Sequence, residues 1–326
     1  HLTVPSLKGK IPESSKTPPR RIGRKGMKLA GNNGKDRTTS RNWVLIIDSG
    51  AGAAGVYEWM RAEERLRGSD LIVFADRVNF PFGAKDQDDL RRIVYHNVNL
   101  VDEYVDRCDG GVIRALVVAS CTASMATAFH LREALDIPVF DVITASAVSA
   151  IRIAGEINIM SRLPLSSGKA PGDAIGILAT VLTVESRAYR NAIGAMDPEV
   201  KVVSEPGYDL IQNIQNHDYS PASLERIRKG IGEKISFFED RGVGVIVLGC
   251  THFSLFRDLF MKEAAGRMII VDPTECIIAE LIRHMERNNI LPPERGCGDS
   301  LLFKTVRGDA GRRLLSMVSL PGFLHP

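Results

Sequence analysis

One continuous apolar segment, at residues 244–249, constrains the fold of this chain more than any other stretch. Between its two terminal glycines it holds valine, isoleucine and leucine without polar interruption, which is typical of a parallel strand buried on both faces. The segment runs directly into Cys250, Thr251 and His252. Because open α/β sheets bind ligands at the carboxyl ends of their strands, Cys250 is a candidate for chemistry. The alternative is a buried structural cysteine, since free cysteines are among the most buried residues.

A second segment, at residues 115–119, follows the same pattern and leads into Ser120, Cys121 and Thr122. Two strand ends of this kind predict two similar half-sites that face one pocket. Such an arrangement suits a reaction that needs one group on each side of a planar intermediate.

Apolar strands alternate with helical segments along the remainder of the chain. In addition to the two strands above, we expect strands at residues 43–47, 71–75, 137–143, 174–179, 202–204, 268–271 and 301–303, with a short helix after the last. Alternation at this spacing predicts a mostly parallel α/β fold. Together with the paired strand ends, it predicts two domains, formed by residues 42–140 plus 255–326 and by residues 141–254.

The composition is that of a globular protein, because 44% of the 326 residues are hydrophobic and 25% are charged. No apolar run approaches the roughly 18 residues that span a bilayer, so no membrane contact is expected. The five cysteines are odd in number, irregularly spaced and without a C-x-x-C pair. This pattern argues against a disulfide scaffold or a structural zinc site and favours a reducing compartment, which we take to be the cytoplasm.

The first 41 residues are strongly basic, and Glu13 and Asp36 are their acidic residues. Proline, glycine, serine and threonine fill most of the remainder, so the segment is expected to be disordered. A nucleic-acid-binding role is disfavoured because no aromatic residues are interleaved with the charges. The composition fits an organelle-targeting segment equally well.

A glycine pattern, Gly50-x-Gly52-x-x-Gly55, follows the first strand, and Asp76 ends the second. This combination matches the fingerprint of dinucleotide-binding folds, in which the acid binds a ribose hydroxyl. Asp48 stands between the strand and the first glycine, however, and a carboxylate beside a pyrophosphate is unfavourable. A dinucleotide-dependent oxidoreductase is therefore the weaker alternative.

Cys250 and His252 could also form a metal site or a hydrolytic pair. Two neighbouring ligands without a convincing third disfavour zinc, so no metal is expected. A cysteine–histidine hydrolase remains an alternative. Otherwise His252 is expected near the rim of the pocket, as an acid or as a group that tunes the pKa of the thiol.

Several ordered motifs resemble those of the cofactor-independent aspartate/glutamate racemases, most closely the glutamate racemases. The resemblance runs from about Val44 to the C-terminus. The matching segments are Asp48-Ser49-Gly50-Ala51-Gly52, Asp76 with Pro81-Phe82-Gly83, residues 117–124, Thr180 with Thr183, Ser186 and Tyr189, and residues 248–252. Motifs that match in this order and separation are far more specific than the glycine pattern alone.

The resemblance implies two similar α/β domains in a pseudo-twofold relation, with the active site between them. It implies a racemase that interconverts L- and D-glutamate, or aspartate, by two-base proton transfer between cysteines, without pyridoxal phosphate or another cofactor. The expected partner is a small amino-acid substrate, and a homodimer is a candidate assembly. Asp48 and His252 match positions that assist the two thiols. The positions that bind substrate are matched by Ser49, Pro81, Phe82, Gly83, Thr122, Thr180 and Thr251.

The sequence departs from the family pattern at the first catalytic cysteine. Ser120 occupies that column, and Cys121 falls where the family has asparagine. A serine hydroxyl is too weak an acid to replace a thiol readily. Proton transfer is therefore expected to be intact on the substrate face served by Cys250 and altered on the other face. Three explanations compete: Cys121 reaches the substrate through a shifted loop, the protein is a one-cysteine, decarboxylase-like relative, or it is an impaired racemase kept for ligand binding.

Overall fold

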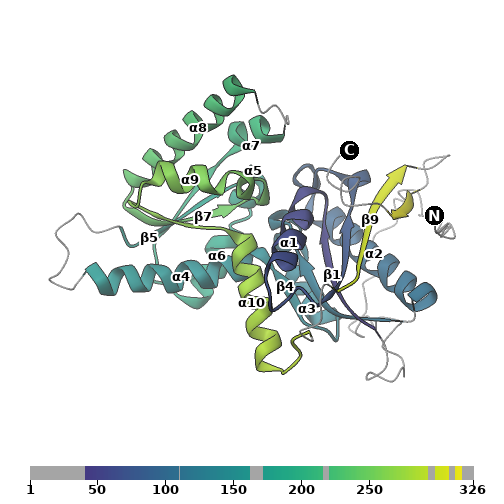
Figure 1. Cartoon of the computed structure of the whole chain (residues 1–326). Helices are drawn as coiled ribbons and strands as arrows, with labels where there is room; N and C mark the ends of the chain where they lie inside the picture. Colours follow the sequence, from purple (N-terminus) through teal and green to yellow (C-terminus); the bar gives the residue numbers. More distant parts are fainter. Residues whose placement is uncertain are drawn as a thin grey trace. The chain divides into compact units, whose positions relative to one another are not determined.

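The computed structural model describes residues 41–109, 111–161, 172–215, 220–292, 298–307 and 313–317 (Figure 1). The chain divides into two compact units, one comprising the residues up to Phe140 and from Ile282 onward, the other Asp141–Leu281. Except for Arg41, the basic segment at residues 1–41 lies outside the described residues. Its expected disorder and targeting role therefore stay predictions.

The first unit is built on a six-stranded sheet with flanking helices. Its elements are β1 (Asn42–Asp48), α1 (Ala51–Ala62), β2 (Asp70–Ala75), α2 (Gln87–Tyr104), β3 (Val112–Val118), α3 (Cys121–Ala134), β4 (Val139–Asp141), β9 (Ser300–Arg307) and β10 (Arg313–Met317). The strand order is β10-β9-β2-β1-β3-β4, and β1 pairs in parallel with both β2 and β3. Helices α2 and α3 contact each other and share a buried cluster with Trp43, Leu45 and Leu116 of the sheet.

The hairpin of β9 and β10 corrects the expectation of a short helix after the last parallel strand. β9 pairs in parallel with β2, but β10 pairs antiparallel with β9, with Arg313 opposite Arg307. The leucines and methionine of β10 favour a helix locally. Pairing with β9 instead satisfies the backbone groups along one side of this segment, and this tertiary contact overrides the local preference.

The second unit is built on a four-stranded parallel sheet. Its elements are α4 (Val142–Ser161), β5 (Ala174–Ala179), α5 (Val181–Glu185), α6 (Ala188–Met196), β6 (Val202–Pro206), α7 (Tyr208–Gln215), α8 (Pro221–Glu239), β7 (Val243–Gly249), α9 (Arg257–Ala264) and β8 (Ile269–Val271). The strand order is β6-β5-β7-β8, and every neighbouring pair is parallel. Helices α7, α8 and α9 lie on one side of this sheet, and α4 and α6 on the other (Figure 1).

The chain returns to the first unit at Ile282, and not at residue 255 as the sequence led us to expect. The reason is that α9 and β8 belong to the second unit: β8 pairs with β7 over Val245–Val247, and Phe260 of α9 joins the buried cluster of Ile246. Periodicity along the chain shows that a strand is present but not which sheet it joins. Helix α10 (Pro273–Arg287) carries the chain from the second unit to the first.

Both sheets share one strand order. Counted along the chain within each unit, the order is second, first, third, fourth, as β2-β1-β3-β4 and as β6-β5-β7-β8. In such folds the ligand crevice lies where the order reverses, beyond the carboxyl ends of the first and third strands. These ends belong to β1 and β3 in one unit and to β5 and β7 in the other. The predicted α/β fold with two similar, mostly parallel sheets is confirmed.

Helix α4 is more apolar than the sequence analysis allowed for, since no run near 18 residues was expected. Among the described residues, its window Val142–Ile159, with a mean hydropathy of 1.3, is the one stretch long and apolar enough to cross a membrane. Within the second unit α4 contacts β5, β7 and α6, and 44% of the window is buried. These contacts are those of a helix packed on its own sheet, and Arg152 and Glu156 interrupt its apolar sequence.

Candidate active site

The place where the strand order of a sheet reverses is called its switch point. Asp48 ends β1 at the switch point of the first unit and is 4% exposed. Its Oδ2 accepts hydrogen bonds from the backbone N–H groups of Gly50 (3.0 Å) and Gly52 (2.9 Å). These are the amides of the glycine pattern that a dinucleotide phosphate would need. The Asp48 carboxylate therefore occupies the position that a phosphate would take in a dinucleotide-binding fold.

Ser120 follows β3, the other strand at this switch point. It is the N-cap residue of α3, and its Oγ accepts a long hydrogen bond of 3.4 Å from the N–H of Ala123. Cys121 and Thr122 form the first turn of α3 and are buried. Because Ile47 lies opposite Val118 in the parallel pair of β1 and β3, Asp48 and Ser120 emerge at the same edge of the sheet.

The loop after β2 brings a third group of predicted residues to this edge. Pro81 and Gly83 are exposed, as expected for residues that meet a substrate. The side chain of Phe82 is 2% exposed and packs in the buried cluster of the first unit. In this structure, Phe82 therefore offers a ligand its backbone and not its ring.

Asp76, which ends β2, is fully buried and holds the loop in place. Its carboxylate accepts hydrogen bonds from Asn79 Nδ2 (2.7 Å), Asn97 Nδ2 (2.7 Å) and Thr305 Oγ1 (2.8 Å). A carboxylate with these partners and no exposed surface cannot bind a ribose hydroxyl. The second half of the dinucleotide fingerprint thus has a structural role.

Cys250 follows β7 at the switch point of the second unit and is 6% exposed. Its Sγ lies 3.5 Å from Nδ1 of His252, within the range of a sulfur hydrogen bond. His252 and Thr251 are partly exposed and begin a turn that spans Thr251–Phe256. The sequence hypothesis of a thiol with an adjacent imidazole therefore has a matching geometry.

A partly buried hydroxyl that was not predicted from the sequence anchors this turn. Ser254 Oγ donates a 2.8 Å hydrogen bond to Oδ1 of Asp272, the residue that follows β8. The same oxygen accepts a 2.7 Å bond from the N–H of Thr274 at the start of α10. A signal was present in the sequence, because an aspartate that follows a strand and precedes a helix often caps that helix.

Thr180 follows β5, and because Ala179 lies opposite Gly249, it emerges beside Cys250. Its hydroxyl caps α5 by accepting from the N–H of Thr183 (3.2 Å), and it donates to Thr183 Oγ1 (2.9 Å). Tyr189 is buried and packs over Gly249, where an added Cβ would lie 3.1 Å from its ring. Thr183 and Tyr189 therefore shape the edge of the sheet, and Thr180 is the member of this motif placed next to the thiol.

Ser120 and Cys250 occupy equivalent backbone positions. Each is the N-cap of the helical turn after the third strand of its unit, with extended φ/ψ angles of −115° and 127° for Ser120 and −146° and 125° for Cys250. Cys121 is then equivalent to Thr251, the first residue inside the turn. This correspondence supports Ser120, and not Cys121, as the counterpart of Cys250.

The described residues of both edges supply few charged groups. Within those residues, no cluster of three His, Cys, Asp or Glu side chains has the geometry of a metal site. The edges instead present a thiol with an imidazole, a carboxylate, several hydroxyls and the N–H groups of helical turns. Such groups can move a proton and stabilise an oxyanion.

Sequence comparison relates the chain to a family of known proteins. Residues 51–281, more than half of the chain, match the Asp/Glu/Hydantoin racemase family. A glutamate racemase of Ralstonia pickettii (strain 12J) is 28% identical over 242 residues, which cover 74% of this chain and 75% of that protein. A glutamate racemase of Halothermothrix orenii is 26% identical over 271 residues, which cover 82% of this chain and 95% of that protein.

Solved structures show the same fold. A glutamate racemase isoform of Bacillus anthracis has a TM-score of 0.65 and 24% identity, covering 83% of this chain and 90% of that one. A glutamate racemase of Francisella tularensis in complex with D-glutamate has a TM-score of 0.65 and 21% identity, covering 88% and 94%. At these identities the likeness establishes the two-domain α/β architecture.

Proposed function

This chain belongs to the Asp/Glu/hydantoin racemase family, and from that premise we propose that it interconverts L- and D-glutamate. The resemblance inferred from the sequence motifs is confirmed by the family match, and the chain is an amino-acid racemase. Glutamate is favoured because relatives from Ralstonia pickettii and Halothermothrix orenii carry the name glutamate racemase. Aspartate is the nearest alternative substrate.

The observation that carries the proposal is the pair of Cys250 and His252 at a switch point, with 3.5 Å between Sγ and Nδ1. A thiolate at Cys250 removes the α-proton of one enantiomer, and the electron pair of the broken C–H bond spreads into the adjacent carboxylate. An imidazole next to the sulfur favours the thiolate when it is protonated, and it can accept the proton from the thiol when it is neutral.

The carbanion needs groups that stabilise negative charge on the substrate carboxylate. Hydroxyls and backbone N–H groups fixed at helical turns are suited to this task, because they need no rearrangement as the charge develops. Ser49, Thr122, Thr180 and Thr251 all lie at the two carboxyl edges. We propose that the residues of each edge serve one face of the substrate α-carbon, as a two-base mechanism requires.

Ser120 is proposed as the acid/base residue of the second face, with Asp48 as its neighbour at the same edge. After Cys250 has removed the α-proton, the Ser120 hydroxyl gives up its own proton to the planar carbon from the opposite face. In the reverse direction Ser120 removes the α-proton and the Cys250 thiol supplies the new one. A serine hydroxyl is a poor proton donor and a very poor base compared with a thiol. The proposed racemase is consequently limited by its Ser120 face.

The alternative in another functional class is a one-cysteine enzyme that exchanges the α-proton on one face, or a protein that binds the amino acid without turnover. Ser120 is the observation that favours this alternative. A dinucleotide-dependent oxidoreductase has less support, because the hydrogen bonds of Asp48 and Asp76 use the groups that the cofactor would need. A cytoplasmic location and a homodimer stay predictions.

The proposal is tested by incubating each enantiomer of glutamate in deuterated water and following the α-proton by NMR. A racemase replaces the proton by deuterium and forms the opposite enantiomer. Exchange with retention of configuration would support chemistry on one face. Absence of exchange for both glutamate and aspartate would overturn the proposed function in favour of ligand binding.

A further inference from the structure

One cationic side chain at the candidate active site, that of Arg77, takes no part in the proton transfer described above. Arg77 directly follows Asp76 and begins the short turn Arg77–Asn79 after β2. Its side chain is partly exposed and bends toward β1, since a Cβ added to Gly50 would lie 3.1 Å from Arg77 Nη1. The guanidinium carbon lies 5.1 Å from the centre of the Phe80 ring, which supports it in a cation–π contact.

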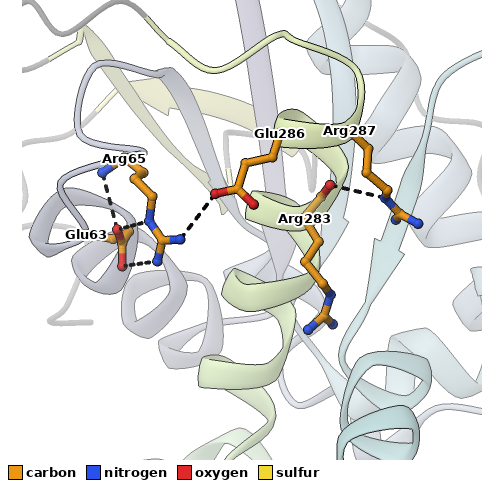
Figure 2. Close-up of polar contacts among 5 residues, drawn as sticks. All are labelled: Glu63, Arg65, Arg283, Glu286 and Arg287. Carbon is orange, nitrogen blue, oxygen red and sulfur yellow. Dashed lines mark hydrogen bonds and ion pairs between the residues drawn. The ribbon is translucent and has the colours of Figure 1, made fainter.

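Arg77 differs from other arginines of the first unit in the ion-pair partners of its guanidinium group. Arg65 is held between Glu63 (2.8 Å) and Glu286 (3.3 Å), as Figure 2 shows. Arg91 and Arg92 pair with Asp88 and Asp89 on α2. In the part of the chain that the structure describes, Arg77 donates no side-chain hydrogen bond and forms no ion pair. Its five N–H donors are thus available to an anion.

The position of this guanidinium fits the second carboxylate of an acidic amino acid. Gly50 lies just past the end of β1, and β1 is the neighbour of β3, whose end carries Ser120. Adjacent strands are about 4.8 Å apart, so Gly50 and Ser120 follow neighbouring strand ends at one edge of the sheet. The two methylenes of glutamate separate its α-carbon from its side-chain carboxylate by a comparable length.

We propose that Arg77 binds the side-chain carboxylate of the substrate and thereby selects a dicarboxylic amino acid. This inference rests on the proposed function of the same site and names a residue that determines its specificity. The planar guanidinium can bind a carboxylate through two parallel hydrogen bonds. Phe80 fixes the plane of the guanidinium from one side, and Gly50 leaves the room it occupies.

The test compares wild type with Arg77→Gln and Arg77→Lys, using glutamate and its neutral isostere glutamine in the α-proton exchange assay. Loss of a charge-assisted hydrogen bond raises KM for glutamate in Arg77→Gln by about 10- to 100-fold, with kcat nearly unchanged. Kinetics with glutamine do not change, because glutamine carries no charge for Arg77 to bind. Arg77→Lys is intermediate, since an ammonium keeps the charge but not the paired geometry.

Arg65→Gln is the matched control, because it removes an arginine of the same unit whose partners are Glu63 and Glu286. It leaves KM for glutamate unchanged. The inference is overturned if Arg77→Gln also leaves KM for glutamate unchanged, or if it raises KM for glutamate and glutamine together. The second result would mean that Arg77 shapes the loop and does not contact the carboxylate.

Binding of glutarate separates this inference from the proposed function. Glutarate has two carboxylates but no amino group and undergoes no racemisation, so calorimetry measures recognition alone. The inference predicts that wild type binds glutarate more tightly than butyrate and that Arg77→Gln abolishes the difference. If glutarate binding depends on Arg77 but glutamate shows no exchange, the proposed function fails and the carboxylate site stands. Equal affinities for glutarate and butyrate in wild type would overturn the inference.

Discussion

The carboxyl edges of the two sheets have the same backbone plan and different chemical groups. At each switch point, the third strand of the unit is followed by a residue with extended φ/ψ angles that caps a helical turn. This residue is Ser120 in one unit and Cys250 in the other. Cys250 has an imidazole at 3.5 Å, whereas the hydroxyl of Ser120 accepts from a backbone amide at 3.4 Å. Two half-sites built alike are therefore equipped for proton transfer to very different degrees.

The difference shows that the fold alone does not determine the reaction. The strand order positions a side chain at each switch point, but the acidity of that side chain decides whether it can take and return a proton. A thiol at one end and a hydroxyl at the other make the two directions of racemisation depend on one strong and one weak acid/base group. The variants below test how strongly the two groups differ in proton transfer.

The largest effect is expected at Cys250. Cys250→Ser replaces the thiol by a hydroxyl and should lower α-proton exchange by at least about 10²–10⁴-fold, which is the typical contribution of a positioned acid/base group. Exchange in deuterated water measures it. Cys276→Ser is the control, since Cys276 is also a buried cysteine of the second unit but lies on α10. Equal loss in both variants would mean that the effect reports stability and not chemistry.

The next largest effect concerns stability and not the reaction. Asp76→Ala leaves the buried donors of Asn97 and Thr305 without their acceptor and should lower the free energy of unfolding by about 3–5 kcal/mol. Chemical denaturation measures it. The loop that carries Pro81 and Gly83 should loosen at the same time and raise KM. A stable variant with unchanged KM would contradict the anchoring role of Asp76.

Particular strands and side chains show which features of the fold and of the candidate site could be predicted from the sequence and which could not. The strands at residues 43–47 and 244–249 were predictable because continuous apolar, β-branched segments have few other solutions. The position of β10 and the sheet that β8 joins were not, because pairing with a distant strand decided both. Cys250 and Ser120 were found from local motifs. The bond of Ser254 to Asp272 and the place of Arg77 beside Gly50 depend on the fold and left little trace in the sequence.

Asp48 should show an intermediate effect that separates its charge from its hydrogen bonds. Both of its bonds, to Gly50 and Gly52, use one oxygen, so Asp48→Asn can keep them while it removes the charge. Hydrogen bonds to an ionised acceptor are roughly twice as strong as neutral ones, so the variant should lose about 1 kcal/mol of stability. Racemisation should fall further than this loss of stability explains. If kcat is unchanged in a folded variant, Asp48 is a helix cap and takes no part in proton transfer.

The smallest effect on the reaction is expected at Ser254. Ser254→Ala removes one neutral-to-charged hydrogen bond to Asp272 and should cost about 1–3 kcal/mol of stability. The turn that carries Thr251 and His252 then loses an anchor, so kcat should fall several-fold and its pH profile should shift. Ser254→Thr keeps the hydroxyl and should restore the profile. A loss of stability without a shift would limit Ser254 to a structural role.

The residue at position 120 sets the proposed limit on racemisation, and one comparison of racemisation rates tests this most directly. Ser120→Cys should raise the racemisation rate by about 10²–10⁴-fold, because a thiol replaces a hydroxyl at the position equivalent to Cys250. Cys121→Ser should leave the rate near that of wild type. The opposite pattern, with Ser120→Cys unchanged and Cys121→Ser inactive, would show that Cys121 is the second acid/base and that the equivalence of Ser120 with Cys250 is wrong.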